Sequence, residues 1–369
     1  MNTSIPIEQF LKLSKEIPVF DVRSPGEFAQ GHIPNAHNTP LFNNEERAKV
    51  GTAYKHIGRE KAIKIGLELV GPKLSSFIKQ VEGLITEHSN RELLTATALL
   101  QSTYSPERPP TVLVYCWRGG MRSANFTWLL NLAGIKTFTL KNGYKTYRNF
   151  VLKSFENEVN IIILGGETGS GKTKILKKIE DGGEQIIDLE NLAHHKGSAF
   201  GALGEKAQPT QEQFENNLSF HINKIDLSKR FWLEDESRAI GSCYIPNPLW
   251  EKMKQAPIIR VKIPKQDRIK RLMFDYGNFS KEELANCICK ISKRLGPQHA
   301  KHALKELEKE NLSEVTDIAL TYYDKAYDYN HEKRKFKDVF IVECENDDVN
   351  LNAEKVIEFA NKKFKKEYV

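Results

Sequence analysis

The sequence predicts an α/β protein of two domains, each built on a parallel sheet covered by helices. Short apolar runs alternate with helical patterns along the whole chain, which is typical of consecutive βα units. The length of 369 residues corresponds to two domains at ~150 residues each. We place the boundary just before the strongest apolar run, so that residues 1–152 form the first domain and residues 153–369 the second.

In the first domain, residues 18–22, 111–115 and 137–140 are apolar runs bounded by turn residues and predict strands. Residues 74–81 and 124–128 have helical patterns. The second domain repeats this alternation and ends in an amphipathic helix expected at residues 355–366. Its expected strands are residues 160–164, 185–188, 231–233, 258–261 and 339–342.

The composition predicts a folded, cytoplasmic protein. Hydrophobic residues make up 40% of the chain and charged residues 28%, which excludes wholesale disorder. No apolar stretch approaches the ~18–20 residues of a membrane span, and the first residues lack a signal-peptide pattern. Five scattered cysteines do not form a disulfide framework. The net charge of +7 permits an anionic partner but does not identify one.

The strongest motif lies between the expected strand 160–164 and a helical pattern, and it matches the phosphate-binding loop GxxxxGK[ST] without a mismatch. Its glycines let backbone N–H groups turn toward phosphate oxygens, while the lysine and the helix start add positive potential. A glycine-rich turn that only joins strand to helix is the alternative. The residues expected to bind phosphate are Gly166, Gly169, Ser170, Gly171, Lys172 and Thr173.

A candidate acidic partner follows the expected strand 231–233. Asp235 or Glu236 could hold a magnesium ion together with Thr173, although solvated acids at a strand end explain the pattern equally well. No four-ligand zinc spacing occurs among the cysteines and histidines, so we expect no such metal site and no tightly bound cofactor. The pair His194-His195 precedes a run of small residues, which fits either a substrate loop or a solvated pair.

A second chemical centre begins at Cys116, directly after the expected strand 111–115. Its loop contains two glycines and leads into a helical pattern, so that N–H dipoles converge near the sulfur. Arg118 and Arg122 raise the positive potential further and favour a thiolate that can react with, or carry, an anionic group. A buried structural cysteine is the alternative. We expect Cys116, Arg118 and Arg122 to be catalytic.

Two basic clusters of the second domain are candidates for RNA binding. Lys265, Arg268 and Arg271 have the spacing of one helix face. The second cluster consists of Lys333, Arg334 and Lys335, and near it lie tyrosines that could stack on unpaired bases, namely Tyr322, Tyr323, Tyr327 and Tyr329. A solvated charged face is the alternative for both clusters.

The segments from Asp21 to Phe28 and from Gly31 to Ala36 resemble the opening of a rhodanese domain, and Cys116 falls where that family carries its sulfur-bearing cysteine. A rhodanese-like domain followed by a P-loop NTPase-like α/β domain, with YCWRGGMRS and GGETGSGKT in this order, resembles the tRNA 2-selenouridine synthase family. The resemblance covers essentially the whole chain.

This resemblance implies an enzyme that acts on 2-thiouridine at the wobble position, in the anticodon region of certain tRNAs. It would transfer a geranyl group from geranyl diphosphate to the sulfur and then replace the S-geranyl group with selenium from selenophosphate. Cys116 would carry the selenium as a selenyl-sulfide, and the loop from Gly166 to Thr173 would bind the diphosphate of the geranyl donor. The selenophosphate-producing enzyme could be a protein partner.

One departure keeps other functions open. Five residues separate Cys116 from Arg122, whereas many single-domain sulfurtransferases have four, and the longer spacing also marks cysteine-dependent phosphatases. The alternatives are therefore a phosphatase or a sulfurtransferase fused to a nucleotide-binding domain. A nucleotide-gated RNA-binding protein with an inert rhodanese-like half is a third, although intact Cys116 and Arg122 argue against it. A phosphatase would need a carboxylic acid near Cys116, which the sequence does not identify.

Overall fold

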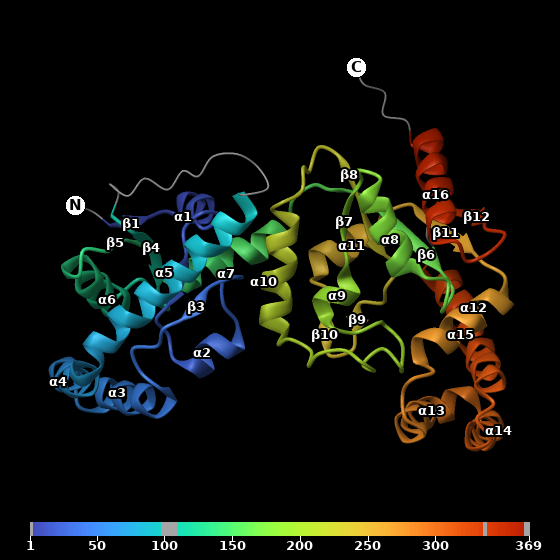
Figure 1. The fold of residues 1–369 in the computed structure, drawn as a ribbon, viewed down its shortest axis with the longest axis horizontal. Coiled ribbons are helices and arrows are strands. Elements are labelled where there is room, and N and C mark those ends of the chain that lie inside the picture. Colours follow the sequence, from blue (N-terminus) through green and yellow to red (C-terminus); the bar gives the residue numbers. More distant parts are fainter. Residues whose placement is uncertain (1–2, 97–108, 335–337, 365–369) are drawn as a thin grey trace. The chain divides into compact units, whose positions relative to one another are not determined.

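The computed structural model of the chain describes residues 3–96, 109–334 and 338–364. The chain divides into two compact units, Met1–Lys153 and Ser154–Val369, and each unit is built on its own five-stranded sheet (Figure 1). All neighbouring strands in both five-stranded sheets are parallel, which confirms the predicted α/β class. In the described part of the chain, no helix combines the length and the hydrophobicity that a membrane-spanning segment needs.

The sheet of the first unit has the strand order β1-β5-β4-β2-β3. Its strands are β1 (Ser4–Ile5), β2 (Val19–Asp21), β3 (His37–Asn38), β4 (Thr111–Tyr115) and β5 (Lys136–Leu140). Its helices are α1 (Ile7–Leu13), α2 (Pro25–Gln30), α3 (Asn44–His56), α4 (Arg59–Val70), α5 (Leu74–Ala96), α6 (Met121–Leu132) and α7 (Gly143–Ser154), with a 3₁₀ turn at Gly71–Lys73. The three predicted strands are confirmed, while β1 and β3 are too short to leave a periodic pattern.

The central strand β4 of this sheet is covered on both faces. Val112 and Val114 pack with Phe126 of α6 and Phe77 of α5 in one apolar cluster. On the other face, the ring of Tyr115 meets Phe10 edge to face. Burial on both faces is what a parallel sheet requires, and it explains the uninterrupted apolar run in the sequence.

The sheet of the second unit has the strand order β12-β11-β6-β8-β7. Its strands are β6 (Asn160–Gly166), β7 (Gln185–Ile187), β8 (Arg230–Glu234), β11 (Ile258–Lys262) and β12 (Val339–Glu343), and β9 (Ala239–Ile240) pairs with β10 (Cys243–Tyr244) in a separate hairpin. The five strands expected from the sequence are all present. Leu164, Trp232 and Ile259 from three of them share a core cluster with Ile175 and Val356 from two helices.

The helices of the second unit fall into two groups. Those that accompany the sheet are α8 (Lys172–Asp181), α9 (Leu189–Ala193), α10 (Gln211–Ile222), α11 (Asn247–Gln255) and α16 (Val349–Lys363). The terminal helix therefore begins six residues before its predicted start at residue 355. The others are α12 (Lys265–Tyr276), α13 (Lys281–Leu295), α14 (Pro297–Glu308) and α15 (Leu312–Arg334).

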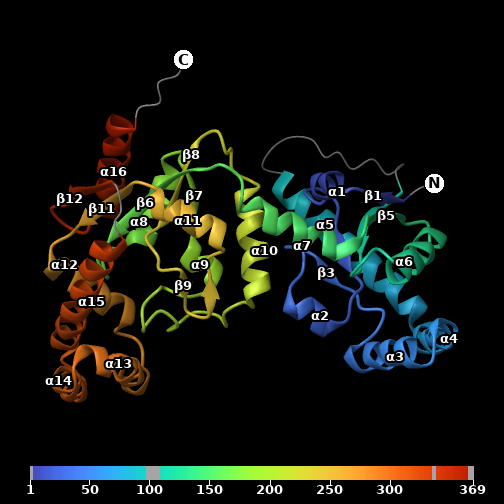
Figure 2. The same cartoon turned by 180° about the vertical axis from the view of Figure 1, so that it is seen from behind.

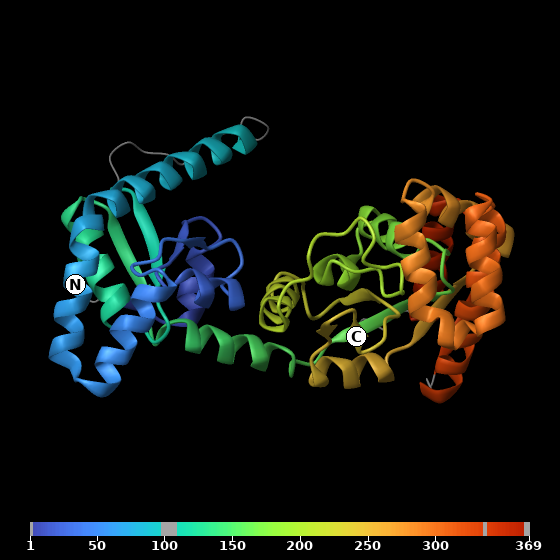
Figure 3. The same cartoon turned by 90° about the horizontal axis from the view of Figure 1, so that it is seen from below.

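The helices α13, α14 and α15 build a second apolar core of their own. Leu284, Ile288 and Ile291 from α13 pack with Leu307 and Val315 from the other two helices. The group is gathered beside α12 and away from α9 and α10 in Figure 2, and the same group is seen from below in Figure 3. The sequence predicted helical patterns in this region but not their separate core.

Candidate functional site

Cys116 directly follows the buried strand β4, and its sulfur lies beside the first turn of α6. The side chain is only 3% exposed. Its Sγ lies 3.2 Å from Oγ of Ser123, whose hydroxyl is also 3.1 Å from the carbonyl oxygen of Gly120. A hydroxyl is both donor and acceptor, so Ser123 can accept from a thiol or turn to donate to a thiolate. This partner of the sulfur was not singled out from the sequence.

The loop after Cys116 is fixed by the first residues of α7. The N–H of Tyr144 donates to the carbonyl oxygen of Cys116 at 2.8 Å, and the N–H of Lys145 donates to that of Trp117 at 3.0 Å. Gly143 has φ +62°, and a Cβ there would lie 2.3 Å from the Cys116 carbonyl oxygen. Only glycine fits so close an approach. Sequence reasoning missed Gly143, because nothing local shows that α7 packs on this loop.

The structure gives the two arginines of this loop different surroundings. Arg122 donates to both carboxylate oxygens of Glu27, at 2.8 and 3.4 Å. Ser24 and Glu27 form a capping box that begins α2, which holds this carboxylate in place. Arg118 is exposed. An anion that binds near Cys116 could therefore pair with the exposed Arg118 directly, whereas it would have to displace Glu27 in order to pair with Arg122.

Glu27 is also the carboxyl group that bears on the phosphatase alternative. Burial acts to raise its pKa, but the hydrogen bonds and charge of Arg122 outweigh burial and lower the pKa to about 2. At neutral pH this group is ionised, so it cannot donate the proton that a phosphatase needs from its general acid. The arrangement therefore does not favour the phosphatase interpretation.

The rhodanese-like opening segment contributes a buried ion pair. Arg23 and Asp21 lie 2.6 Å apart, and both side chains are buried. Burial by itself lowers the pKa of Arg23, but the hydrogen bonds to Asp21 reverse this and raise the pKa above its usual value. The guanidinium also lies over the ring of Tyr144, 3.7 Å from its centroid. Arg23 therefore ties β2 to the start of α7, which in turn supports the Cys116 loop.

The phosphate-binding motif has the predicted setting between β6 and α8. Gly166 ends the strand, and Gly171 precedes the helix with φ +75°. The ammonium of Lys172 donates to the carbonyl oxygen of Gly166 at 2.9 Å, and the Thr173 hydroxyl donates to Glu190 at 2.7 Å. Gly169 and Ser170 lie between them, so all the predicted residues share one loop. Phosphate binding by this loop stays a prediction.

Arg268 and Arg271 lie on one face of α12, as their spacing predicts. Both interpretations of this cluster, RNA binding and a solvated face, assumed exposed side chains, and that assumption is wrong. Both side chains are less than 8% exposed. Arg268 donates to the carbonyl oxygen of Thr168 at 3.2 Å and to the Asp324 carboxylate at 2.8 Å. Arg271 donates to the carbonyl oxygen of Ser170 at 3.3 Å and pairs with Asp347. The two arginines therefore hold the phosphate-binding loop.

The other basic candidates are placed differently. Lys265, on the same face of α12, is more exposed and lies 2.7 Å from Asp317. Lys333 and Arg334 end α15, but their side chains, like Lys335 as a whole, lie outside the described part of the chain. Contacts between tRNA and any of these residues, or Arg268 and Arg271, stay predictions.

The tyrosines expected to stack on bases are largely engaged elsewhere. The hydroxyl of Tyr327 accepts from the N–H of Gly166 at 2.8 Å and donates to Asp235 at 2.9 Å, so Tyr327 belongs to the phosphate-binding loop. Tyr323 accepts from the N–H of Ala199 at 3.1 Å. Tyr329 is 55% exposed, and its stacking on a base stays a prediction.

The acidic residue beside Thr173 is Glu190, which the sequence did not identify. Asp235 is bonded to Tyr327 instead, and Glu236 is buried next to Glu190. Burial first, and the charge of Glu190 next, raise the pKa of Glu236 well above its usual value. In the described ranges, no group of three or more His, Cys, Asp or Glu side chains is arranged to hold a metal ion. The Thr173 hydroxyl thus bonds to Glu190 and not to Asp235 or Glu236, and magnesium binding by either of these two residues with Thr173 stays a prediction.

A different signal could have pointed to Glu190. It follows the expected strand at residues 185–188, and carboxyl ends of neighbouring parallel strands meet at one edge of a sheet. The pairing of β7 with β8, which ends directly before Asp235 and Glu236, appears only in the structure.

Comparisons with known proteins cover both units. Residues 159–356 match the model described as tRNA 2-selenouridine synthase AAA domain, and residues 7–67 match the rhodanese-like domain, a match that ends before Cys116. A tRNA 2-selenouridine synthase of Serratia proteamaculans is 34% identical over 88% of this chain and 90% of its own length. One from Sulfurovum sp. is 34% identical over 88% of this chain and 91% of its own length.

Among solved structures, the chain is similar to the N-terminal domain of a putative ATP/GTP binding protein from Clostridium difficile 630. The identity is 38%, the alignment covers 41% of this chain and 99% of that one, and the TM-score is 0.33.

We predict that Arg268→Ala weakens binding of inorganic diphosphate about tenfold or more, because the Thr168 carbonyl and Asp324 lose their charged donor and the loop loses a fixed position. Isothermal titration of diphosphate into the full chain measures this. Lys265→Ala removes a cation from the same helix face without touching the loop, so it should bind diphosphate like the wild type. Equal affinities for wild type and Arg268→Ala would show that Arg268 does not hold the loop in its binding conformation.

Proposed function

The chain belongs to the tRNA 2-selenouridine synthase family, and from this premise we propose that it converts 2-thiouridine in tRNA to 2-selenouridine by two successive reactions at one position of the base. What carries the proposal is the presence in one chain of two different centres. Cys116 lies between β4 and α6 in the first unit, and the phosphate-binding loop precedes α8 in the second. The proposed RNA substrate is the anticodon region of tRNA, and the proposed donors are geranyl diphosphate and selenophosphate.

The proposed first reaction is transfer of a geranyl group to the sulfur of 2-thiouridine. The sulfur attacks the first carbon of geranyl diphosphate, the carbon–oxygen bond breaks, and diphosphate leaves with the electron pair. Negative charge develops on the departing diphosphate, and preorganised positive groups stabilise it. Lys172, the N–H groups of the loop and the amino-terminal end of α8 are the groups available for this.

A magnesium ion could take part in binding the diphosphate. Magnesium is usually held by one or two protein oxygens together with substrate phosphates, so it does not need a complete protein cage. The Thr173 hydroxyl and the Glu190 carboxylate, 2.7 Å apart, are the oxygen donors that would hold it. The ion would supply additional positive charge for the departing diphosphate.

The proposed second reaction replaces the S-geranyl group with selenium by way of Cys116. The Cys116 thiolate would take selenium from selenophosphate as the phosphorus–selenium bond breaks and phosphite leaves. The carried selenium then attacks the carbon that bears the S-geranyl group, the carbon–sulfur bond breaks and geranyl thiol leaves, and a second thiol reduces the selenium–sulfur bond to free the base. Alkylation makes this exchange chemically reasonable, because a thiocarbonyl sulfur leaves poorly until it has become a thioether. Arg118 and, when it releases Glu27, Arg122 would bind the anionic selenium donor near the sulfur. The enzyme that makes selenophosphate is a natural candidate for a protein partner at this step.

We predict that Cys116→Ala abolishes 2-selenouridine formation while S-geranyl-2-thiouridine accumulates, since forming a thioether needs no cysteine. Mass analysis of nucleosides digested from tRNA checks both products. Cys289→Ala, which alters an exposed cysteine in α13, is the matched control and should behave like the wild type. Undiminished 2-selenouridine from Cys116→Ala would exclude the proposed role of this sulfur.

We predict the opposite defect for Lys172→Ala. Loss of the ammonium should slow geranyl transfer roughly a hundredfold, by analogy with removal of one preorganised donor from a charged transition state. Lys174→Ala changes a more exposed lysine of the same helix and should leave the rate unchanged. Supplying tRNA that already carries the geranyl group should restore selenation by Lys172→Ala, and a wild-type rate of geranylation in that variant would contradict the proposal.

A further inference from the structure

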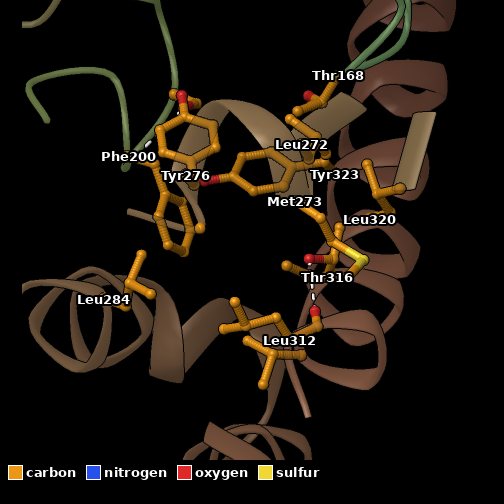
Figure 4. A pocket seen from close by; sticks show the side chains of 14 residues that line it. Thr168, Phe200, Leu272, Met273, Tyr276, Leu284, Leu312, Thr316, Leu320 and Tyr323 are labelled. Carbon is orange, nitrogen blue, oxygen red and sulfur yellow. Dashed lines mark hydrogen bonds between the residues drawn. The ribbon is translucent and has the colours of Figure 1, made fainter. Parts of the chain in front are cut away.

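An apolar pocket opens beside the phosphate-binding loop in the second unit (Figure 4). It contains about 590 Å³ of empty space, part of it open to solvent. Helices α12, α13 and α15 form most of its walls, and loop residues that include Thr168 and Phe200 complete them.

The pocket is continuous with the loop. Thr168, in the middle of the loop, is itself one of the lining residues. Leu272, another lining residue, packs so closely under Gly169 that a Cβ there would lie 2.9 Å from its Cγ. In Figure 4, Thr168 lies at one end of the pocket, and Leu284 and Leu312 lie toward the other. A ligand with its phosphates in the loop could therefore extend its remaining part into the pocket.

The chemistry of the walls favours a hydrocarbon. Leucine, methionine, valine and aromatic side chains form most of the surface. Two of the polar groups are already engaged, because Thr316 donates to the carbonyl oxygen of Leu312 at 2.7 Å and Tyr323 accepts from the N–H of Ala199. A nucleotide base and ribose would lose hydrogen bonds with water on entering such a space. An unbranched or isoprenoid chain would lose none.

The loop that begins at His194-His195 joins the pocket to the acidic residues behind the phosphate-binding loop. Gly197 packs directly on the carboxylate of Glu236, where a Cβ would lie 2.4 Å from an oxygen. Ser198 and Phe200 then line the pocket, and Phe200 meets the ring of Tyr276 edge to face at 5.8 Å. The loop therefore closes one side of the apolar space next to the site where chemistry is proposed.

We propose that this pocket binds the hydrocarbon chain of a prenyl diphosphate whose diphosphate occupies the loop from Gly166 to Thr173. The inference rests on the proposed function, in which geranyl diphosphate is the alkyl donor, and it adds a physical basis for donor selection. Leu284 and Leu312, opposite the loop, limit the length of chain that fits.

The first test compares geranyl diphosphate with inorganic diphosphate by isothermal titration into the full chain. Because each buried methylene contributes about fourfold in affinity, geranyl diphosphate should bind the wild type at least tenfold more tightly. Ala319→Phe fills the pocket from α15 and should reduce this preference to about one, with affinity for inorganic diphosphate unchanged. Ser313→Phe adds the same ring at an exposed position of α15 and should keep the preference.

A second variant guards against misfolding of the first. Leu312→Ala enlarges the far end of the pocket and should raise the affinity for farnesyl diphosphate relative to geranyl diphosphate several-fold. Damage to the fold cannot explain both a lost preference for geranyl diphosphate in Ala319→Phe and a raised relative affinity for farnesyl diphosphate in Leu312→Ala. If Ala319→Phe keeps the wild-type preference, or if Leu312→Ala leaves the chain-length preference unchanged, the pocket does not hold the chain.

Nucleoside analysis separates failure of this inference from failure of the proposed function. If wild-type protein geranylates tRNA while the pocket variants keep every preference, the function stands and the pocket assignment is wrong. If wild-type protein forms no geranylated nucleoside but the pocket variants shift prenyl diphosphate binding as described, the pocket assignment stands and the proposed donor reaction is wrong.

Discussion

The position of the phosphate-binding loop in the second unit depends on two buried arginines that donate hydrogen bonds to its carbonyl oxygens. Arg268 and Arg271 donate to Thr168 and Ser170, and their own charges are balanced by Asp324 and Asp347. Buried charges are tolerated only when they are paired and hydrogen-bonded, so the loop, α12 and the acidic partners must assemble together. Arg271 also explains the glycine at position 171, where a Cβ would lie 1.3 Å from its Nη1.

Helix α12 contacts both the phosphate-binding loop and the apolar pocket, so it connects the proposed diphosphate site with the proposed site for the hydrocarbon chain of the donor. The face of α12 that carries the arginines fixes the phosphate-binding loop, while Leu272 and Met273 from that helix line the apolar pocket. In each unit, the reactive loop follows the central strand of its sheet, β4 before Cys116 and β6 before the glycine-rich loop. A central parallel strand is buried on both faces, which gives these loops a rigid base.

The sequence could predict what is local and not what depends on packing between distant segments. Both loops are contiguous motifs, and the apolar runs before them are strands as expected. The prediction that Arg268 and Arg271 share one face of α12 was also correct. Their burial was not predicted, because it depends on ion pairs with Asp324 and Asp347, which no local sequence pattern connects with α12. Glu190 and Gly143 were missed for the same reason, since strand order and helix packing bring them to their sites.

The proposed function requires one chain to perform two reactions in sequence, the first of which prepares the base for the second. Its most direct test is a time course with purified full-length protein, tRNA containing 2-thiouridine, and selenophosphate, with and without geranyl diphosphate. Nucleoside mass analysis should show S-geranyl-2-thiouridine rising before 2-selenouridine, and no 2-selenouridine when geranyl diphosphate is omitted. Formation of 2-selenouridine at an undiminished rate without geranyl diphosphate would contradict the account.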